Sequence, residues 1–157
     1  IQELLSETKI RPELLEIEIT ETSIMDNIDT AIATLTELRG MGLSVALDDF
    51  GTGHSSLSQL KILPVDTLKI DRSFINGIEG DDSDRSIVEA ILVLSSKLKL
   101  NVVAEGIETA EQLTILEVNN CPFGQGYLFD RPLSEESMLE RITDLSSAWP
   151  SHHSPAC

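Results

Sequence analysis

The sequence predicts an α/β fold in which helices cover a parallel sheet. Five short runs of apolar and β-branched residues recur along the chain, and amphipathic helical patterns lie between or after them. Strands that alternate with helices in this way form parallel sheets. The 157 residues, 41% of them hydrophobic, suffice for one domain with its own core. A complete (β/α)8 barrel takes about 250 residues, so five units alone suggest an open, doubly wound sheet.

The predicted strands are short and rich in β-branched residues, as buried strands are. They span residues 14–20, 43–48, 67–71, 101–104 and 126–129. Apolar residues at helical spacing predict helices that begin after Asn27, Ser83, Thr109 and Ser134, and a shorter helix over residues 57–63 that ends at Pro64. Gly40 stops the helix that follows Asn27, and Thr109 with Gln112 forms a capping box.

The two ends of the chain differ in character. Apolar residues at positions 1, 4 and 5 are typical of the end of an amphipathic helix, so we expect the chain to be part of a longer protein. Residues 147–157 hold two prolines and no periodic pattern, which predicts a flexible tail. The predicted domain is therefore residues 1–146.

The charge is strongly acidic, with 11 basic and 27 acidic residues and a formal net charge of −16. Such a field repels nucleic-acid backbone and anionic membrane, so we expect no DNA or RNA duplex and no membrane contact. An anionic small substrate can still bind where metal ions invert the field locally. Cys121 and Cys157 match no metal-ligand or disulfide pattern, which fits a reducing, cytoplasmic location.

Charged and polar side chains recur near the ends of the predicted strands, where parallel α/β folds place their active sites. They are Glu18, Glu21, Asp48, Asp49, Lys69, Asp71, Glu105 and Glu108, with Gln125 at the start of the fifth strand. Converging carboxylates repel one another unless cations hold them. Hard oxygen ligands at this density suit Mg²⁺ or Mn²⁺.

Adjacent Asp48 and Asp49 are the clearest sign of a metal site. Neighbouring side chains on a strand point to opposite faces, but a turn at Gly51 and Gly53 would let both reach one site. One aspartate could then bridge two metal ions. The dipeptide by itself is also typical of a solvated turn.

Lys69 lies inside a predicted strand, which is unusual for a lysine. Its ammonium could orient a water molecule or a phosphate oxygen, or its amine could form a Schiff base. A lysine that only snorkels from an edge strand is the alternative without function.

Five runs taken in order resemble the EAL domain family over about residues 1–145. They are residues 18–21 (EITE), 48–53 (DDFGTG), 69–71 (KID), 104–109 (AEGIET) and 125–127 (QGY). The family fold is a modified (β/α)8 barrel, and its activity is the hydrolysis of cyclic di-GMP to a linear dinucleotide. The resemblance therefore implies a TIM-barrel-like fold, present here as an incomplete barrel of about five βα units.

The resemblance also implies roles for individual residues. Glu18, Asp48 and Asp49 would be metal ligands for Mg²⁺ or Mn²⁺, and Lys69 and Glu105 would position or deprotonate the attacking water. Glu21 would anchor the loop after the aspartates, formed by Phe50, Gly51, Thr52 and Gly53, which also takes part in dimer contacts. Glu108 and Gln125 would complete the pocket wall, with Asp71 beside the site.

The chain departs from the family in one respect, because the Glu-Ala-Leu signature is absent. That glutamate and an asparagine ligand would lie upstream of Ile1, so we expect this chain alone to be weak or inactive. Open sheet edges near residues 15–20 and 126–129 predict a homodimer or an exchange of elements. The alternatives are a module that binds cyclic di-GMP or a protein without hydrolysis, a barrel enzyme with a Schiff-base lysine, and an inert fragment.

Overall fold

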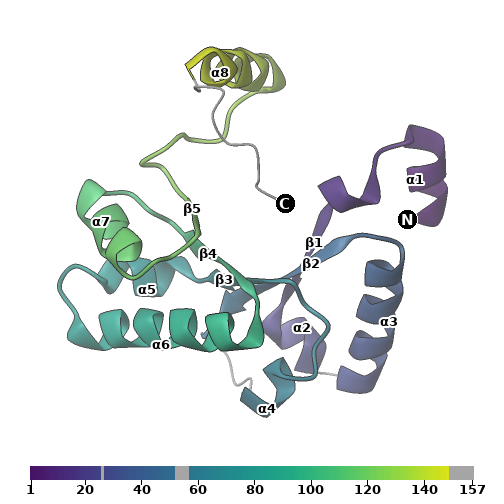
Figure 1. Cartoon of the computed structure of the whole chain (residues 1–157), viewed down its shortest axis with the longest axis horizontal. Coiled ribbons are helices and arrows are strands. Elements are labelled where there is room, and N and C mark those ends of the chain that lie inside the picture. Colours follow the sequence, from purple (N-terminus) through teal and green to yellow (C-terminus); the bar gives the residue numbers. More distant parts are fainter. Residues whose placement is uncertain (26, 52–56, 149–157) are drawn as a thin grey trace, which may run out of the picture.

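The computed structural model describes residues 1–25, 27–51 and 57–148, and it confirms the α/β fold with a parallel sheet. The five strands lie side by side in chain order (Figure 1) and all neighbours are parallel. They are β1 (Glu16–Thr20), β2 (Ser44–Phe50), β3 (Thr67–Ile70), β4 (Asn101–Glu105) and β5 (Phe123–Gln125). Because the strand order follows the sequence without reversal, the sheet is a section of a barrel wall and not a doubly wound sheet.

The helices are α1 (Gln2–Thr8), α2 (Glu21–Met25), α3 (Ile28–Gly40), α4 (Leu57–Leu60), α5 (Arg72–Gly77), α6 (Asp82–Leu98), α7 (Ala110–Val118) and α8 (Glu135–Ala148), with a 3₁₀ turn η1 at Pro12–Leu14. The sequence predicted neither α2 nor α5, because five or six residues are too few to show a helical period. Asn27 caps α3, and the capping box of α7 is confirmed.

The predicted cap of α6 is wrong by two residues. Asp81 is the N-cap, and its side chain accepts a hydrogen bond of 2.7 Å from the backbone N–H of Ser83. Aspartate is a strong cap because its carboxylate accepts a hydrogen bond from a free backbone N–H. Its negative charge is also attracted to the positive end of the helix dipole. Ser83 therefore donates to the cap and lies inside the first turn.

The core lies between the sheet and the helices on one of its faces. Leu47, Leu68 and Ile70 are fully buried on the strands, and Ile75 and Val88 are fully buried on α5 and α6. Alternate residues of a strand point to opposite faces, so these positions commit every second side chain of β2 and β3 to the core. The residues between them face the other way.

The prediction for the fifth strand is wrong in position. The strand is Phe123–Gln125, and residues 126–129 form a turn. Gly126 packs directly on the backbone of Ile107, so that any Cβ there would collide with it. The turn is pinned to the same residue, because Leu128 N–H donates to Ile107 O at 2.9 Å. Gln125 thus ends β5 and does not open it.

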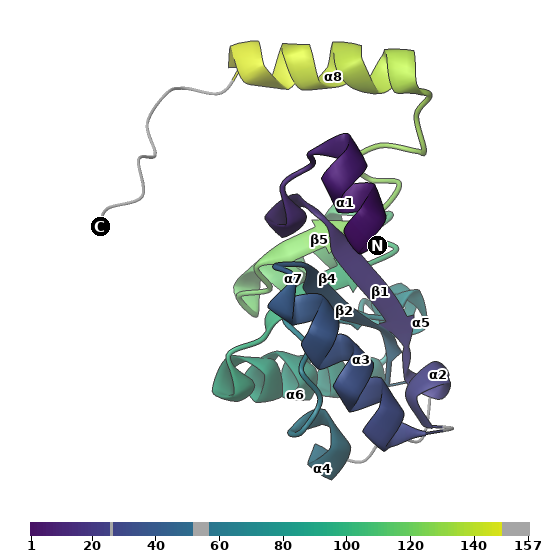
Figure 2. The same ribbon diagram turned by 90° about the vertical axis from the view of Figure 1, so that its right-hand side faces the viewer.

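The last helix stands apart from the layers of the fold. Figure 2 shows α8 beyond the end of the sheet, on the side opposite α4. Its side chains Met138, Leu139 and Ile142 are exposed by about half. The predicted tail begins inside this helix, and residues 149–157 lie outside the described residues.

Across the described ranges, no helix is both long and apolar enough to cross a membrane. A cytoplasmic location remains a prediction.

Candidate active site

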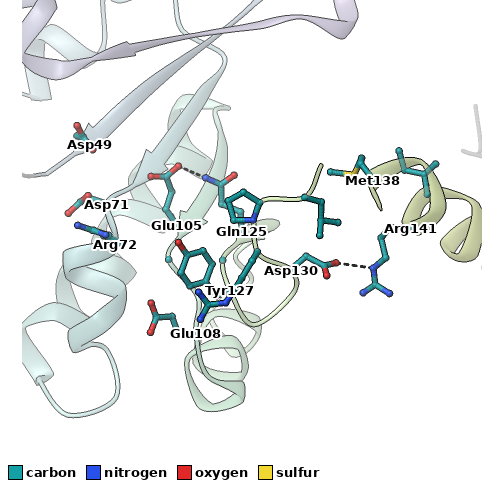
Figure 3. A pocket seen from close by; sticks show the side chains of 16 residues that line it. Asp49, Asp71, Arg72, Glu105, Glu108, Gln125, Tyr127, Asp130, Met138 and Arg141 are labelled. Atoms are coloured by element: carbon teal, nitrogen blue, oxygen red, sulfur yellow. Dashed lines mark hydrogen bonds and ion pairs between the residues drawn. The ribbon is translucent and has the colours of Figure 1, made fainter. Parts of the chain in front are cut away.

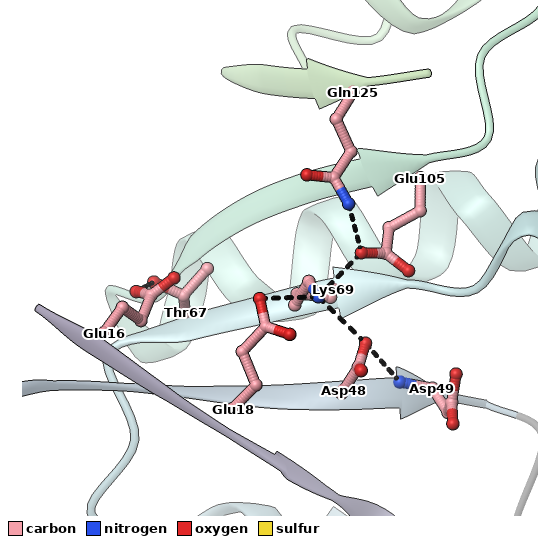
Figure 4. A network of polar contacts seen from close by, with 8 residues as sticks. All are labelled: Glu16, Glu18, Asp48, Asp49, Thr67, Lys69, Glu105 and Gln125. Carbon is pink, nitrogen blue, oxygen red and sulfur yellow. Dashed lines mark hydrogen bonds and ion pairs between the residues drawn. The ribbon is translucent and has the colours of Figure 1, made fainter. Parts of the chain in front are cut away.

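A polar network occupies the face of the sheet that the core leaves free (Figure 4). On β1, Glu16 and Glu18 alternate with isoleucines, and on β3, Thr67 and Lys69 alternate with Leu68 and Ile70. Thr67 Oγ1 donates a hydrogen bond of 2.8 Å to Glu16 Oε2 across the sheet. Parallel register keeps equivalent positions on one face, so charged groups from several strands meet there.

Lys69 lies at the centre of this network. Its ammonium is 2.7 Å from Glu18 Oε1, 2.8 Å from Glu105 Oε1 and 3.2 Å from Asp48 Oδ1. We call these four residues the Lys69 cluster. The Lys69 side chain is 7% exposed. Burial alone lowers the pKa of Lys69, but hydrogen bonds to Glu105, Glu18 and Asp48 raise it above its ordinary value. The three carboxylates thus favour the ammonium form of Lys69, and the buried side chain does not snorkel to solvent.

The backbone changes conformation at the second of the two adjacent aspartates. Asp49 adopts a left-handed conformation with φ +55°, and the pairing of β2 with β3 shifts register between Leu47 and Phe50. Asp48 therefore stays on the Lys69 face, and its Oδ1 accepts a hydrogen bond of 3.0 Å from Asp49 N–H. The sequence placed the required turn at Gly51 and Gly53. In the structure the backbone already turns at Asp49, and Gly51 follows with φ +99°.

Glu105 and Gln125 meet at the ends of the neighbouring strands β4 and β5, where they are paired in register. Gln125 Nε2 donates a hydrogen bond of 2.6 Å to Glu105 Oε1, the oxygen that also contacts Lys69. Among the described residues, the hydrogen bonds and ion pairs of the Glu105 carboxylate all involve Oε1. Its Oε2 takes part in none of these contacts.

Two carboxyl groups of the site have pKa values above their ordinary range. For Glu105, burial is the main cause, and repulsion by Asp48 and Glu18 adds to it, against the attraction of Lys69. For Asp49, burial again comes first, followed by the charges of Asp48 and Asp71. A raised carboxyl pKa makes each group a stronger base and a tighter proton binder.

Asp71 and Glu21 begin helices directly after strands. Asp71 is the N-cap of α5, and its Oδ1 accepts hydrogen bonds from Ser73 N–H at 3.0 Å and Ser73 Oγ at 2.5 Å. Burial tends to raise the pKa of Asp71, but these bonds hold it below its ordinary value. Glu21 opens α2 and is buried, with 3% exposure. Its predicted role as a loop anchor remains a prediction.

The predicted loop is described only in part. Phe50 is buried as the last residue of β2, and Gly51 follows it in contact with the Phe74 ring. Thr52 and Gly53 lie outside the described residues.

A cavity of about 660 Å³ extends from the Lys69 cluster toward α8 (Figure 3). It is lined by five of the predicted residues, Asp49, Asp71, Glu105, Glu108 and Gln125. Tyr127 and Arg131 also line it, although no role was predicted for either. The available signal was an aromatic residue and an arginine four positions apart, which is too common to single out.

The oxygen-rich donor set suits hard divalent cations. Glu18 and Asp48 already share one cation, the Lys69 ammonium, and Asp49 follows Asp48 in the chain. Within the described part of the chain, no three His, Cys, Asp or Glu residues form a group that could by itself hold a metal ion. Glu18, Asp48 and Asp49 thus fit as carboxylate ligands, and a metal ion bound to them would need additional ligands to complete its coordination.

The comparisons with known proteins agree with this geometry. A family model described as EAL domain matches residues 1–132. The chain belongs to the EAL family. It is 51% identical over 126 residues to the cyclic di-GMP phosphodiesterase NbdA of Pseudomonas aeruginosa, a match that covers 80% of this chain and 16% of NbdA.

Two solved EAL structures extend the comparison. The phosphodiesterase PaMucR, in complex with c-di-GMP, superposes with a TM-score of 0.84 at 42% identity, over 87% of this chain and 56% of that one. BlrP1 of Klebsiella pneumoniae, in a manganese and cyclic di-GMP complex, matches with a TM-score of 0.78 at 35% identity, over 83% of this chain and 33% of that one. The TIM-barrel-like fold predicted from the resemblance is therefore confirmed. The chain spans about half of the PaMucR structure and a much smaller share of NbdA.

Membership of the EAL family removes the basis of the Schiff-base alternative. The environment of Lys69 agrees, because an ammonium held by three carboxylates is not the free amine that attacks a carbonyl.

Proposed function

We propose that this chain carries a cyclic di-GMP phosphodiesterase site that hydrolyses the cyclic dinucleotide to linear pGpG in bacterial second-messenger signalling. The observation that carries the proposal is the Lys69 cluster, in which one buried ammonium contacts carboxylates from β1, β2 and β4. Support also comes from the names of its relatives, NbdA and PaMucR, which are phosphodiesterases.

Glu105 and Lys69 are the residues best placed to act on the attacking water. Glu105 Oε1 is held by Lys69 and Gln125, so the carboxylate is fixed and its Oε2 can accept the water proton. The raised pKa of Glu105 increases its strength as a base. The ammonium of Lys69 would orient the water and favour the negative charge that develops on the phosphate oxygens.

Glu18, Asp48 and Asp49 are the residues that would hold divalent metal ions, Mg²⁺ or Mn²⁺. The complex of BlrP1 with manganese and cyclic di-GMP supports this assignment. Two bound ions would lower the pKa of a water molecule and neutralise the phosphodiester charge. The carboxylates also explain why an acidic protein can take an anionic substrate, since metal ions reverse the local field.

A second candidate is a module that binds cyclic di-GMP without hydrolysing it. Its support is that, among the described residues, no three His, Cys, Asp or Glu side chains form a group that could hold a metal ion. Under this alternative, the Lys69 cluster would form the floor of a binding site and take no part in catalysis.

The decisive experiment follows the conversion of cyclic di-GMP to pGpG by chromatography, with Mg²⁺ or Mn²⁺, for the wild-type chain and for Glu105→Gln. Turnover that is lost in the variant supports the phosphodiesterase proposal. Binding of the dinucleotide by calorimetry without any turnover supports the binding module. A chain that neither binds nor hydrolyses it contradicts both.

A further inference from the structure

A second cavity lies at the other end of the sheet from the Lys69 cluster. Its volume is about 360 Å³, and its basic residues all come shortly before strands, with Arg39 before β2, Lys61 before β3 and Lys99 before β4. Because neighbouring strands are parallel, these residues gather at the N-terminal ends of the strands, whereas Glu105 ends β4. Among the described residues that line the second cavity, none has a proposed role in hydrolysis. A ligand there would therefore bind outside the active site.

The charged groups of the second cavity are mainly basic, against the balance of the whole chain. Arg39, Lys61 and Lys99 line it together with one acidic residue, Asp66, although the chain has 27 acidic and 11 basic residues. Both oxygens of Asp66 are engaged. Oδ1 lies 2.7 Å from Arg39 Nη2, and Oδ2 accepts a hydrogen bond of 3.0 Å from Val45 N–H. Asp66 thus neutralises Arg39 and holds it in place, but it neutralises neither lysine.

The two lysines of the second cavity have no carboxylate partner within the described ranges. Every ion pair found there involves other basic residues, namely Arg39, Lys69 and Arg141. Lys61 and Lys99 are both exposed, and two ammonium groups that line one hollow repel each other. A bound anion would replace this repulsion with two attractions.

Helix dipoles account for only one of these lysines. Lys99 is the C-cap of α6, a helix of 17 residues, so its charge also favours the negative end of that helix. Lys61 follows α4, which has four residues. A helix dipole is the sum of aligned peptide units, so one turn attracts a cation only weakly. The presence of Lys61 in the second cavity therefore has no explanation in the helix that precedes it.

The surface that the second cavity offers to a ligand is mostly polar. Its buried apolar residues belong to the core beneath, and they are Leu60, Leu63 and Val65. Asn101, the first residue of β4, is exposed beside the three basic side chains and adds an amide donor. Ammonium and amide donors suit an anion with several acceptor oxygens, such as a phosphate group. The volume of about 360 Å³ lies near the lower limit of small-molecule sites, which favours a compact anion.

We propose that the second cavity is a binding site for a small multivalent oxyanion of the phosphate or diphosphate type. Lys61 and Lys99 would hold the anion, and Arg39, fixed by Asp66, would add a positive charge beside it. The anion is either free or the end of a larger molecule, since the same donors recognise both. The site is independent of the proposed hydrolysis and requires neither divalent metal ions nor cyclic di-GMP.

The test measures the binding of inorganic pyrophosphate to the full chain by NMR titration at constant ionic strength. The protein is first freed of divalent ions on a chelating resin, so that no metal ion can carry the anion to the active site. Wild type should show chemical-shift changes centred on residues 60–66 and 98–101. Lys61→Gln and Lys99→Gln should each weaken binding by about 2- to 10-fold, whereas Lys61→Arg and Lys99→Arg, which keep the charge, should retain it.

The matched control is Lys97→Gln, which removes the same charge from the exposed surface of α6 but from a residue that does not line the second cavity. It should leave the affinity unchanged. Absence of binding by wild type at millimolar pyrophosphate, or equal weakening by Lys97→Gln and Lys61→Gln, would overturn the site, because the lysines would then act only as diffuse charge. Adenosine diphosphate extends the test. Tighter binding than that of pyrophosphate supports a site for the end of a larger molecule, and equal binding supports a site for the free anion.

The outcome is separable from that of the proposed function. Pyrophosphate binding that is lost in Lys61→Gln supports the second site even if cyclic di-GMP is not hydrolysed. Hydrolysis of cyclic di-GMP by a chain that does not bind pyrophosphate would overturn the second site and leave the phosphodiesterase proposal standing.

Discussion

Lys69 and Glu105 are joined by an ion pair of 2.8 Å between Nζ and Oε1, although the sheet places them on different strands. The same ammonium contacts Glu18 at 2.7 Å. The pKa of each member lies above its ordinary value for a different reason: burial raises the pKa of Glu105 against the attraction of Lys69, whereas hydrogen bonds to the carboxylates raise the pKa of Lys69 against burial. The charged form is thus favoured for the lysine and disfavoured for the glutamate.

Replacing Lys69 should therefore destabilise the fold. Lys69→Met leaves the carboxylates of Glu18, Asp48 and Glu105 without their shared cation, and we expect a loss of about 1–3 kcal/mol in the free energy of unfolding. Urea denaturation at neutral pH measures the change. Lys97→Met is the control, since Lys97 lies exposed in the last turn of α6. Equal stability of the two variants would show that the ion pairs contribute nothing.

Glu105→Gln should behave in the opposite way. Because the folded state disfavours the charged Glu105, the neutral isostere should be at least as stable as wild type at neutral pH, while turnover of cyclic di-GMP is lost. Glu105 would then be a residue that serves activity while lowering the free energy of unfolding. A variant that is both inactive and strongly destabilised would instead show that Glu105 is mainly structural.

The pH dependence follows from the same shift. A carboxyl with a raised pKa binds its proton more tightly in the folded state, so its contribution to stability is full below about pH 4 and is lost as pH rises through the raised pKa. Glu105→Gln lacks this loss. Its stability relative to wild type should therefore increase between about pH 4 and pH 7, as followed by denaturation at several pH values. A difference that stays constant over this range would contradict the raised pKa.

Asp71 and Asp81 offer a matched pair of caps, since each accepts from the serine two residues on. Replacing either with alanine should cost about 0.5–2 kcal/mol. Only Asp71 lines the cavity, so only Asp71→Ala should also reduce turnover beyond its effect on folding. Since the pKa of Asp71 is lowered, its contribution to stability is present above the ordinary carboxyl pKa and is lost as pH falls through the lowered value.

Divalent ions should stabilise the chain through the aspartates of β2. Saturating Mn²⁺ at about 100 times its Kd would add about 2.7 kcal/mol, seen as a higher Tm that EDTA reverses. Asp48→Asn and Asp49→Asn should reduce this increase, while Asp29→Asn, an exposed acid on α3, should not. A Tm shift that is the same in all the variants would indicate non-specific binding to an acidic surface.

The open edges at β1 and β5 predict association of copies of the chain. β1 and β5 each have one neighbour in the sheet, and Leu14, Leu15 and Phe123 are exposed at or beside these edges. Unpaired edges with apolar neighbours favour strand pairing, although the net charge of −16 opposes it. Light scattering after size-exclusion chromatography should therefore show a homodimer that dissociates at low ionic strength. A dispersed monomer at all salt concentrations would contradict the prediction.

The long elements could be predicted from the sequence because their signals are local. The helix after Asn27 and the capping box of Thr109 depend on residues within a few positions, and the structure retains both. The start of α6 was missed by two residues because aspartate and serine both make good caps. The fifth strand was misplaced because the backbone of Ile107, far away along the chain, forces a turn at Gly126.

The candidate site likewise has some features that can be read from the sequence and others that depend on the tertiary structure. The sequence by itself determined that carboxylates and a lysine lie near the ends of successive strands, since residue type and strand period can be read along the chain. It placed Gln125 at the start of the fifth strand, whereas Gln125 ends that strand. Only the tertiary structure decided that Lys69 is the shared partner of Glu18, Asp48 and Glu105, that the backbone turns at Asp49, and that Arg131 lies over the Tyr127 ring in the cavity. Distances between side chains on different strands depend on register and backbone conformation, and these are set by packing of the whole sheet against its helices.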